Sequence, residues 1–435
     1  MSEINSVEPF ADGFITALCP ELIIFVGLIL LIIVPNLGKG TVRIPGTQAR
    51  VMWFLGGNRF SLTSNPKLPA WIATITLGAA FVQTMLSFQD GVDRTAIVTE
   101  SGKQLMLVNG FSRVFELIFF GALTLAAFAS MNRLEVKGVG PKLSTDDLYN
   151  NRRQADFYIL MLTCGLGMSV VALAQDLFVL FIGLELASFS TYVLVAFYKE
   201  TKVGTEAGMK YFIVGSVASG VGLYGLSMLY LWAGSLQFDA LAAQFVVDGT
   251  EPLPLIAMGF VLVGFGFKVS AAPFHFAAPD AYAGASSPVA GILATASKAM
   301  GIIGLLRMLL IVASPEASED GTVWLTLLGV LSIITMTWGN IAALGSKNPK
   351  RMLAYSSVAH AGYMLAAITA IGAWNWDASL AGDGGESAVA VLTALIFHLI
   401  VLVAFKLGAF LVLSILESFK TFACRSVDRQ ALSAI

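Results

Sequence analysis

The sequence has few charged side chains for its length. Only 12% of its 435 residues are Asp, Glu, Lys or Arg, whereas soluble domains carry about 25%. Such a chain lacks the polar surface that a water-soluble protein of this size needs. Its net charge of −2 argues against a nucleic-acid partner.

Cysteine and histidine are also scarce. The three cysteines, Cys19, Cys164 and Cys424, stand far apart and form no C-x-x-C pair. This spacing argues against a disulfide framework, an iron–sulfur cluster and a structural zinc site. Three histidines are too few to favour a haem or a multi-histidine metal centre. We therefore expect this chain to bind no metal and no cofactor.

Apolar residues are abundant, at 57% of the chain, and the mean hydropathy is +0.79. A helix needs about 20 apolar residues to cross a bilayer. The sequence contains about eleven such stretches: 15–34, 70–87, 112–130, 156–174, 177–198, 205–233, 253–274, 288–312, 322–345, 351–372 and 389–416. They are continuous and not alternating, which excludes transmembrane strands. The pattern predicts an all-α polytopic membrane protein.

The charges of the loops predict the orientation. Lysine and arginine favour the loops after the first, third, fifth, ninth and eleventh stretches, and most intervening loops are acid-rich. By the positive-inside rule, the N-terminus lies outside and the C-terminus inside. An odd number of spans agrees with this assignment.

Several ionisable residues lie inside the predicted spans, where a charge costs about 2.5–3.5 kcal/mol on insertion scales. They are Glu185, Lys210, Lys268, Lys298, His360, His398 and Lys406. At a rise of about 1.5 Å per residue, all of these except Lys210 and Lys406 fall near the bilayer midplane. Those two lie closer to the inner side.

Lysine is the informative residue type in this set. Its ammonium group loses a proton readily when it is desolvated, whereas arginine stays charged. A row of such lysines beside a glutamate is therefore typical of a proton relay. The alternative is a set of buried ion pairs that only fix the packing of the helices.

Pro273 follows Lys268 by five positions. Proline has no N–H and clashes with the carbonyl four residues before it, which here belongs to Val269. Interrupted backbone at membrane depth is tolerated inside protein or beside water, and it is typical of transporter sites. We expect a hydrated helix break here, with a plain kink or an early helix end as the alternative.

Other charges have simpler interpretations. Glu21 and Glu116 lie near predicted helix ends, so we expect them to reach the membrane interface. Arg307 is expected to extend to the interface or to cap a loop carbonyl. Asp176 is expected to cap the helix that follows it.

The polar motifs together resemble a known family. They are GLELAS around Glu185, EAGMKYFIVGS around Lys210, FKVSAAPFHFAAPDAYAGA around Lys268, ATASKAMGIIGLLR around Lys298, and NPKRMLAYSSVAHAGYML around His360. They resemble the antiporter-like membrane subunits of proton-pumping NADH:quinone oxidoreductase, respiratory complex I, and most of all the subunit N branch. The resemblance covers residues 155–415.

The resemblance implies an antiporter-like bundle of inverted five-helix repeats. It divides the chain into 1–150 (three spans and basic loops), 151–315 (the first repeat with its half-channel) and 316–435 (part of the second repeat). Glu185 would be the glutamate of the half-channel and Lys210 a pairing lysine. Lys268 would be the lysine of the broken helix, and Lys298 would bridge the repeats.

The resemblance also implies partners. FMN, iron–sulfur clusters and quinone are expected in other subunits, which would include further antiporter-like membrane subunits, and the setting would be a bacterial plasma membrane. Family members continue with a second proline-broken span, whereas this sequence stops at Ile435, so the second repeat is expected to be incomplete. Lys406 stands where the family generally has a neutral residue. We hypothesise that Lys406 and His398 partly replace the distal site.

Three functions are therefore considered. The first is a proton-translocating subunit of an NADH (or related donor):quinone oxidoreductase. The second is a subunit of a multisubunit cation/proton antiporter, which would share the fold and the Glu–Lys pair. The third is a non-conducting structural subunit that retains the charges.

Overall fold

A computed structural model describes residues 14–33, 41–43, 50–52, 67–91, 93–98, 104–131, 145–199, 201–249, 251–312, 321–376 and 386–417. The helices are α1 (Phe14–Ala17), α2 (Cys19–Ile33), α3 (Leu68–Asp90), α4 (Gly110–Ser130), α5 (Thr145–Leu173), α6 (Leu177–Val195), α7 (Lys202–Ala233), α8 (Phe238–Asp248), α9 (Pro252–Val269), α10 (Ala277–Gly284), α11 (Ser287–Ala294), α12 (Ala296–Val312), α13 (Gly321–Gly345), α14 (Pro349–Trp376) and α15 (Glu386–Leu402), which continues into the π-helical turn η2 (Val403–Leu407). The strands are β1 (Thr41–Arg43), β2 (Arg50–Met52), β3 (Arg94–Val98) and β4 (Gln104–Val108). Cys424, Ile435 and most of the loop 35–69 lie outside the described residues.

Every predicted span corresponds to helix. Among the described residues, ten helical segments are long and apolar enough to cross a membrane. The first predicted span is α1 and α2, separated by a turn at Leu18, and α2 is a shorter apolar helix of 15 residues. Pro20 lies in the first turn of α2, where its missing N–H costs no helical bond. The chain is an all-α integral membrane protein.

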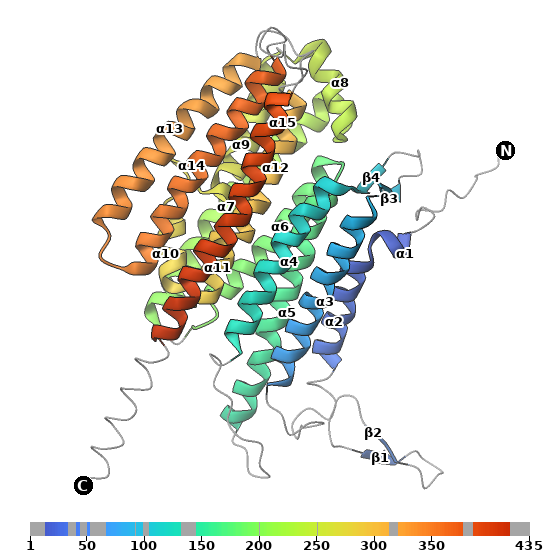
Figure 1. Cartoon of the computed structure of the whole chain (residues 1–435), viewed down its shortest axis with the longest axis vertical. Helices are drawn as coiled ribbons and strands as arrows, with labels where there is room; N and C mark the ends of the chain where they lie inside the picture. Colours follow the sequence, from blue (N-terminus) through green and yellow to red (C-terminus); the bar gives the residue numbers. More distant parts are fainter. Residues whose placement is uncertain are drawn as a thin grey trace, which may run out of the picture.

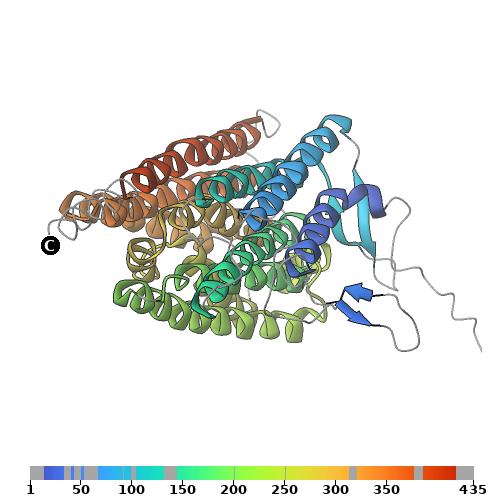
Figure 2. The same cartoon turned by 90° about the horizontal axis from the view of Figure 1, so that it is seen from below.

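The helices form a bundle around a buried central segment (Figure 1). Helices α2 to α5 lie on one side, and α13 to α15 lie on the other. The segment Ser287–Leu309, which comprises α11 and most of α12, is buried along its whole length. The view from below shows the same order, with the C-terminal helices at the far side of the bundle from β1 and β2 (Figure 2). This arrangement places Lys298 at the centre of the protein.

One end of the N-terminal helices is covered by α1 and an antiparallel hairpin. Strands β3 and β4 pair with Arg94 opposite Val108. A small apolar core beneath the hairpin joins Ala17, Ala96, Met106 and Leu173. This cover corrects one expectation, because it buries Glu21 and Glu116, which are 8% and 0% exposed, and they do not reach the interface.

The predicted cap of α6 is confirmed. Oδ1 of Asp176 accepts hydrogen bonds from the backbone N–H groups of Phe178 and Val179, at 2.7 and 3.2 Å. These are two of the donors that a helix N-terminus leaves unpaired. The carboxylate therefore holds the start of the helix that carries Glu185.

The break near Pro273 begins before the proline. Helix α9 ends at Val269, and Ser270 adopts the left-handed conformation with φ of 62°. Pro273 lies in the non-helical segment between α9 and α10. The interruption is thus a helix end, one of the expected alternatives, and it leaves Lys268 in the last turn of α9.

Two further interruptions lie beside lysines. Thr295 separates α11 from α12, with φ of −121° and ψ of −84°, three residues before Lys298. The π-helical turn η2 contains Lys406. Each of the buried lysines 268, 298 and 406 therefore lies within a few residues of irregular helix.

Arg307 binds backbone carbonyls, as in the expected alternative of a capped loop carbonyl, but these carbonyls lie at the end of a helix. From α12 it donates hydrogen bonds to the carbonyls of Ala172 and Ala174, at the end of α5. Both residues are fully buried, and the last carbonyls of a helix lack partners within the helix.

We expect Arg307→Leu to destabilise the protein, because an unpaired buried carbonyl costs about 1–3 kcal/mol. Thermal unfolding in detergent measures the effect. Arg351→Leu is the matched control, because that side chain is 48% exposed. Equal unfolding midpoints for the two variants would contradict this prediction.

Candidate functional site

One face of α6 supplies the acidic end of the site. Glu185, Ser188 and Tyr192 are spaced i, i+3 and i+7, which places them on one side of the helix. The partly buried Glu185 accepts a hydrogen bond from Ser219 of α7, whose Oγ lies 2.6 Å from Oε1. The carboxylate is thus fixed by a hydroxyl group.

Lys268 approaches the same face from α9. Its residue is 6% exposed, and its ammonium group donates a hydrogen bond to Oγ of Ser188. The Nζ atom also lies 5.3 Å from the centre of the Tyr192 ring, within the range of a cation–π contact. Ser188 in turn donates to the carbonyl of Leu184, which precedes Glu185.

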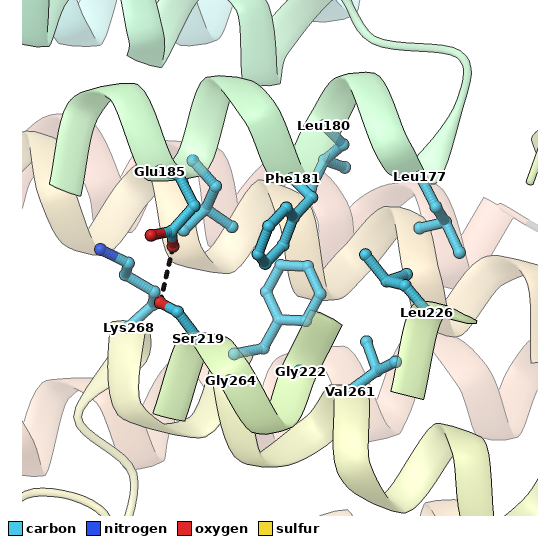
Figure 3. A pocket seen from close by; sticks show the side chains of 12 residues that line it. Leu177, Leu180, Phe181, Glu185, Ser219, Gly222, Leu226, Val261, Gly264 and Lys268 are labelled. Atoms are coloured by element: carbon cyan, nitrogen blue, oxygen red, sulfur yellow. Dashed lines mark hydrogen bonds between the residues drawn. The ribbon is translucent and has the colours of Figure 1, made fainter. Parts of the chain in front are cut away.

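Glu185 and Lys268 face one small cavity (Figure 3). Among the described residues they form no direct ion pair within 4 Å, and Figure 3 shows the hydrogen bond from Ser219 to Glu185 at this cavity. About 20 Å³ of the cavity is open to the centre of a water molecule, which is room for about one water. Most of the other residues that line the cavity, such as Leu177, Leu226 and Val261, are apolar. A single water could therefore join the carboxylate and the amine.

Lys298 connects α12 to the end of α9. Its residue is 1% exposed, and Nζ donates to the carbonyl of Val269 at 3.0 Å. This is the carbonyl that the sequence predicts to be free because of Pro273. The buried amine therefore contacts the backbone next to Lys268.

Lys406 continues the polar contacts to α14. Its residue is fully buried, and Nζ donates to Ser356 Oγ at 2.5 Å and approaches the carbonyl of Leu353 at 3.5 Å. Helix η2 also packs against α11, the helix that leads to Lys298.

The two histidines form a pair. Nδ1 of His360 on α14 lies 3.2 Å from Nε2 of His398 on α15. One of these nitrogens must carry the hydrogen and the other must accept it. His360 lies one helical turn after Ser356, so the pair is on the same side of α14 as the partner of Lys406.

Lys210 lies apart from these buried amines. Its side chain is 49% exposed, and it pairs with Glu206 at 2.6 Å and with Asp280 at 3.1 Å. Asp280 also pairs with Arg351. The structure therefore places Lys210 apart from the contacts that connect Glu185, Lys268 and Lys298.

The buried amines share one electrostatic feature. Within the part of the chain that the structure describes, Lys268, Lys298 and Lys406 have no carboxylate within ion-pair distance. Their partners are hydroxyl and carbonyl oxygens. A charged lysine in this setting is stabilised only in part, which favours reversible loss of its proton.

The sequence interpretation missed the hydroxyl groups. Ser188, Ser219 and Ser356 contact the ionisable residues, and Tyr192 lies over Lys268. The helical spacing from Glu185 would have found Ser188 and Tyr192, and the spacing from His360 would have found Ser356. Ser219 carried no such signal, because it comes from a different helix.

No group of three or more His, Cys, Asp or Glu that could hold a metal ion occurs among the described residues. The available donors are single carboxylates, amines and hydroxyls. This set suits proton transfer better than metal binding.

The comparisons with known proteins agree with the resemblance. Residues 174–382 match the family described as "NADH:quinone oxidoreductase/Mrp antiporter, TM". NADH-quinone oxidoreductase subunit N 2 of Roseiflexus castenholzii is 36% identical over 342 residues, which are 78% of this chain and 64% of that protein. The subunit N 2 of Syntrophobacter fumaroxidans is 40% identical over 60% of this chain and 51% of its own length. The chain thus spans between about half and two thirds of these relatives.

Solved structures show the same fold. A chain of respiratory complex I from Thermus thermophilus matches with a TM-score of 0.63 and 28% identity, over 91% of this chain and 70% of that one. A chain of the Mrp complex from Dietzia matches with a TM-score of 0.68, over 93% of this chain and 64% of that one, and its 18% identity supports the fold alone. Over residues 174–382, the chain is thus similar to the membrane subunits of NADH:quinone oxidoreductases and Mrp antiporters.

Proposed function

We propose that the chain is a proton-translocating membrane subunit of an NADH (or related donor):quinone oxidoreductase. The observation that carries this proposal is the set of buried lysines bonded to hydroxyl and carbonyl oxygens. Similarity to proteins named subunit N supports the same assignment.

In this proposal protons pass between Glu185, Lys268, Lys298, the His360–His398 pair and Lys406. The contact of Lys298 with the carbonyl of Val269 links the first two lysines through the residue that follows Lys268. Pro273 has no N–H to donate to the carbonyl of Val269, so this carbonyl stays available to Lys298. Lys210 would adjust the charge at the inner surface through its pair with Asp280.

The setting and partners belong to the proposal as well. The chain would lie in a bacterial plasma membrane with its N-terminus outside, beside other antiporter-like subunits. Quinone, FMN and iron–sulfur clusters would be held by partner subunits. The divisions 1–150, 151–315 and 316–435 would correspond to the three-span segment, the first repeat and part of the second repeat.

Co-purification with the native partners tests the function. A complex with donor:quinone activity, whose turnover drives proton uptake without sodium, would support the proposal. Sodium-dependent transport without quinone chemistry would instead favour the antiporter alternative, for which the fold match to the Mrp complex is the specific support.

Lys406 provides a second test. If Lys406 and His398 partly replace a distal site, Lys406→Met should lower the number of protons moved per quinone reduced. The fully buried amine would be lost, while methionine keeps an unbranched side chain that is one atom shorter. Lys347→Met is the control, because Lys347 is an exposed residue in the loop between α13 and α14. A full proton stoichiometry in Lys406→Met would contradict this role.

A further inference from the structure

A second group of buried ionisable side chains lies where α2, α4 and α5 meet. Glu21 comes from the first turn of α2, Arg113 and Glu116 from α4, and Ser169 from the end of α5. Glu116 and Ser169 are fully buried, and Arg113 is 2% exposed. None of these residues lines the cavity described above. The group is therefore separate from the candidate relay.

The hydrogen bonds of this group require an additional hydrogen. Oγ of Ser169 lies 2.5 Å from Oε1 of Glu21 and 2.8 Å from Oε1 of Glu116. A serine hydroxyl has one hydrogen, so it donates to only one of these oxygens. The other contact also joins two oxygens at hydrogen-bond distance. A carboxyl group in its acid form supplies the missing hydrogen.

The charge of the group leads to the same conclusion. Arg113 donates to Oε2 of Glu116 at 2.5 Å, whereas it lies 3.9 Å from Oε1 of Glu21. Two ionised carboxylates and one guanidinium would bury a net negative charge, which is costly away from water. One proton on the pair makes the group neutral.

The unpaired atoms indicate where that proton is held. Oε2 of Glu21 is buried and has no hydrogen-bond partner among the described residues. A buried carboxylate oxygen without a donor is expensive, so Glu21 fits the acid form. Glu116, which Arg113 contacts directly, fits the carboxylate form.

We propose that Glu21 and Glu116 bind one proton between them, with Ser169 as the connecting hydroxyl and Arg113 as the counter-ion. The Glu21 acid donates to Ser169, and Ser169 donates to the Glu116 carboxylate. When both hydrogens move along these bonds, the acid becomes Glu116 and the carboxylate becomes Glu21. The group thus holds and transfers a proton without a net change in charge.

Among the described residues, no cation other than Arg113 pairs with Glu21 or Glu116. Asp90 of α3 is exposed. The cations on helices packed against α4 bond elsewhere: Arg307 to the end of α5, Lys298 to Val269 and Lys406 to Ser356. On the far side of α5, the Glu185 and Asp176 carboxylates of α6 and its cap are bonded to Ser219 and to the start of α6.

Infrared spectroscopy of the full chain in its native complex tests the proposal at neutral pH. A carboxylic acid has a C=O stretching band that is distinct from carboxylate bands and shifts in D2O. We expect both Glu21→Gln and Glu116→Gln to lose one such acid band, because either change leaves a single carboxylate beside Arg113. Glu206→Gln is the matched control, since its 66% exposed side chain should lose only carboxylate absorption.

Ser169→Ala gives an independent readout that keeps both carboxyl groups. We expect it to retain the acid band at a shifted frequency, because the hydrogen bond to Oγ is removed. Two results would overturn the proposal. One is a loss of carboxylate absorption alone in both glutamine variants, and the other is an acid band that Ser169→Ala leaves unmoved. If a glutamine variant fails to accumulate, the position of the acid band in Ser169→Ala tests the proposal instead.

Discussion

Replacing Lys268 by methionine is expected to reduce proton translocation by at least about tenfold, the change that 1.36 kcal/mol of added barrier produces. Methionine preserves the unbranched side chain, so α9 should still pack. It removes the only amine that contacts Ser188 among the described residues. Proton uptake by proteoliposomes that contain the complete complex measures the effect.

The Lys268→Arg variant distinguishes a role of Lys268 in proton transfer from a purely structural role of its charge. Arginine keeps the positive charge but does not release its proton. If Lys268 only balances Glu185 as a structural charge, the arginine variant should translocate protons normally. If Lys268 must lose its proton, both variants should fail. Undiminished translocation in Lys268→Met would favour the third alternative, a non-conducting subunit.

Replacing Gly167 by leucine is expected to prevent correct packing of α5 against α6. A Cβ atom at Gly167 would lie 2.5 Å from the backbone nitrogen of Ala187 and 2.7 Å from the carbonyl oxygen of Gly183. Both atoms belong to the backbone of α6, so no side-chain rotation relieves the clash. The two helices would have to separate, and Glu185, which lies between these contacts, would move with α6.

We therefore expect Gly167→Leu to fail to accumulate as folded protein in the membrane. Overpacking a well-packed core typically costs about 1–3 kcal/mol and occasionally more, and here the clash is with backbone atoms that cannot rotate away. Size-exclusion chromatography in detergent and resistance to proteolysis measure the folded fraction. Gly220→Ala is the control, because a Cβ at Gly220 meets no atom within 4 Å. Equal yields of the two variants would contradict the prediction.

The spans could be predicted from sequence because their signal is local. A continuous apolar run of the right length has few alternatives in a bilayer. The same local chemistry predicted the cap at Asp176 and an interruption before Pro273. The breaks at Thr295 and in η2 have no proline, so nothing in the local sequence indicated them.

Burial of the first acidic residues could not be predicted in this way. Glu21 and Glu116 are near helix ends in the sequence, which usually means contact with water or headgroups. They are buried because the β3–β4 hairpin and α1 fold over that end of the helices. This is a tertiary effect, and it depends on strands that the apolar pattern does not report.

The site was predicted best where one helix holds several of its residues. The ionisable residues were found because charged residues are rare in an apolar span, so they can be recognised from the sequence alone. Their partners are hydroxyls, which are common in membrane helices and cost little. Only the crossing of α6, α7 and α9 shows that Ser188 and Ser219 are the ones that matter.

The wide turn η2 behaves like a single residue inserted into an otherwise regular helix. At its end, the N–H of Gly408 is shared between the carbonyls of Ala404 and Phe405. One residue corresponds to about 100° of helical rotation, so the stretch after η2 is turned by that angle relative to the phase of α15. Shortening this segment by one position would swing the Lys406 ammonium group out of the protein interior and towards the acyl chains.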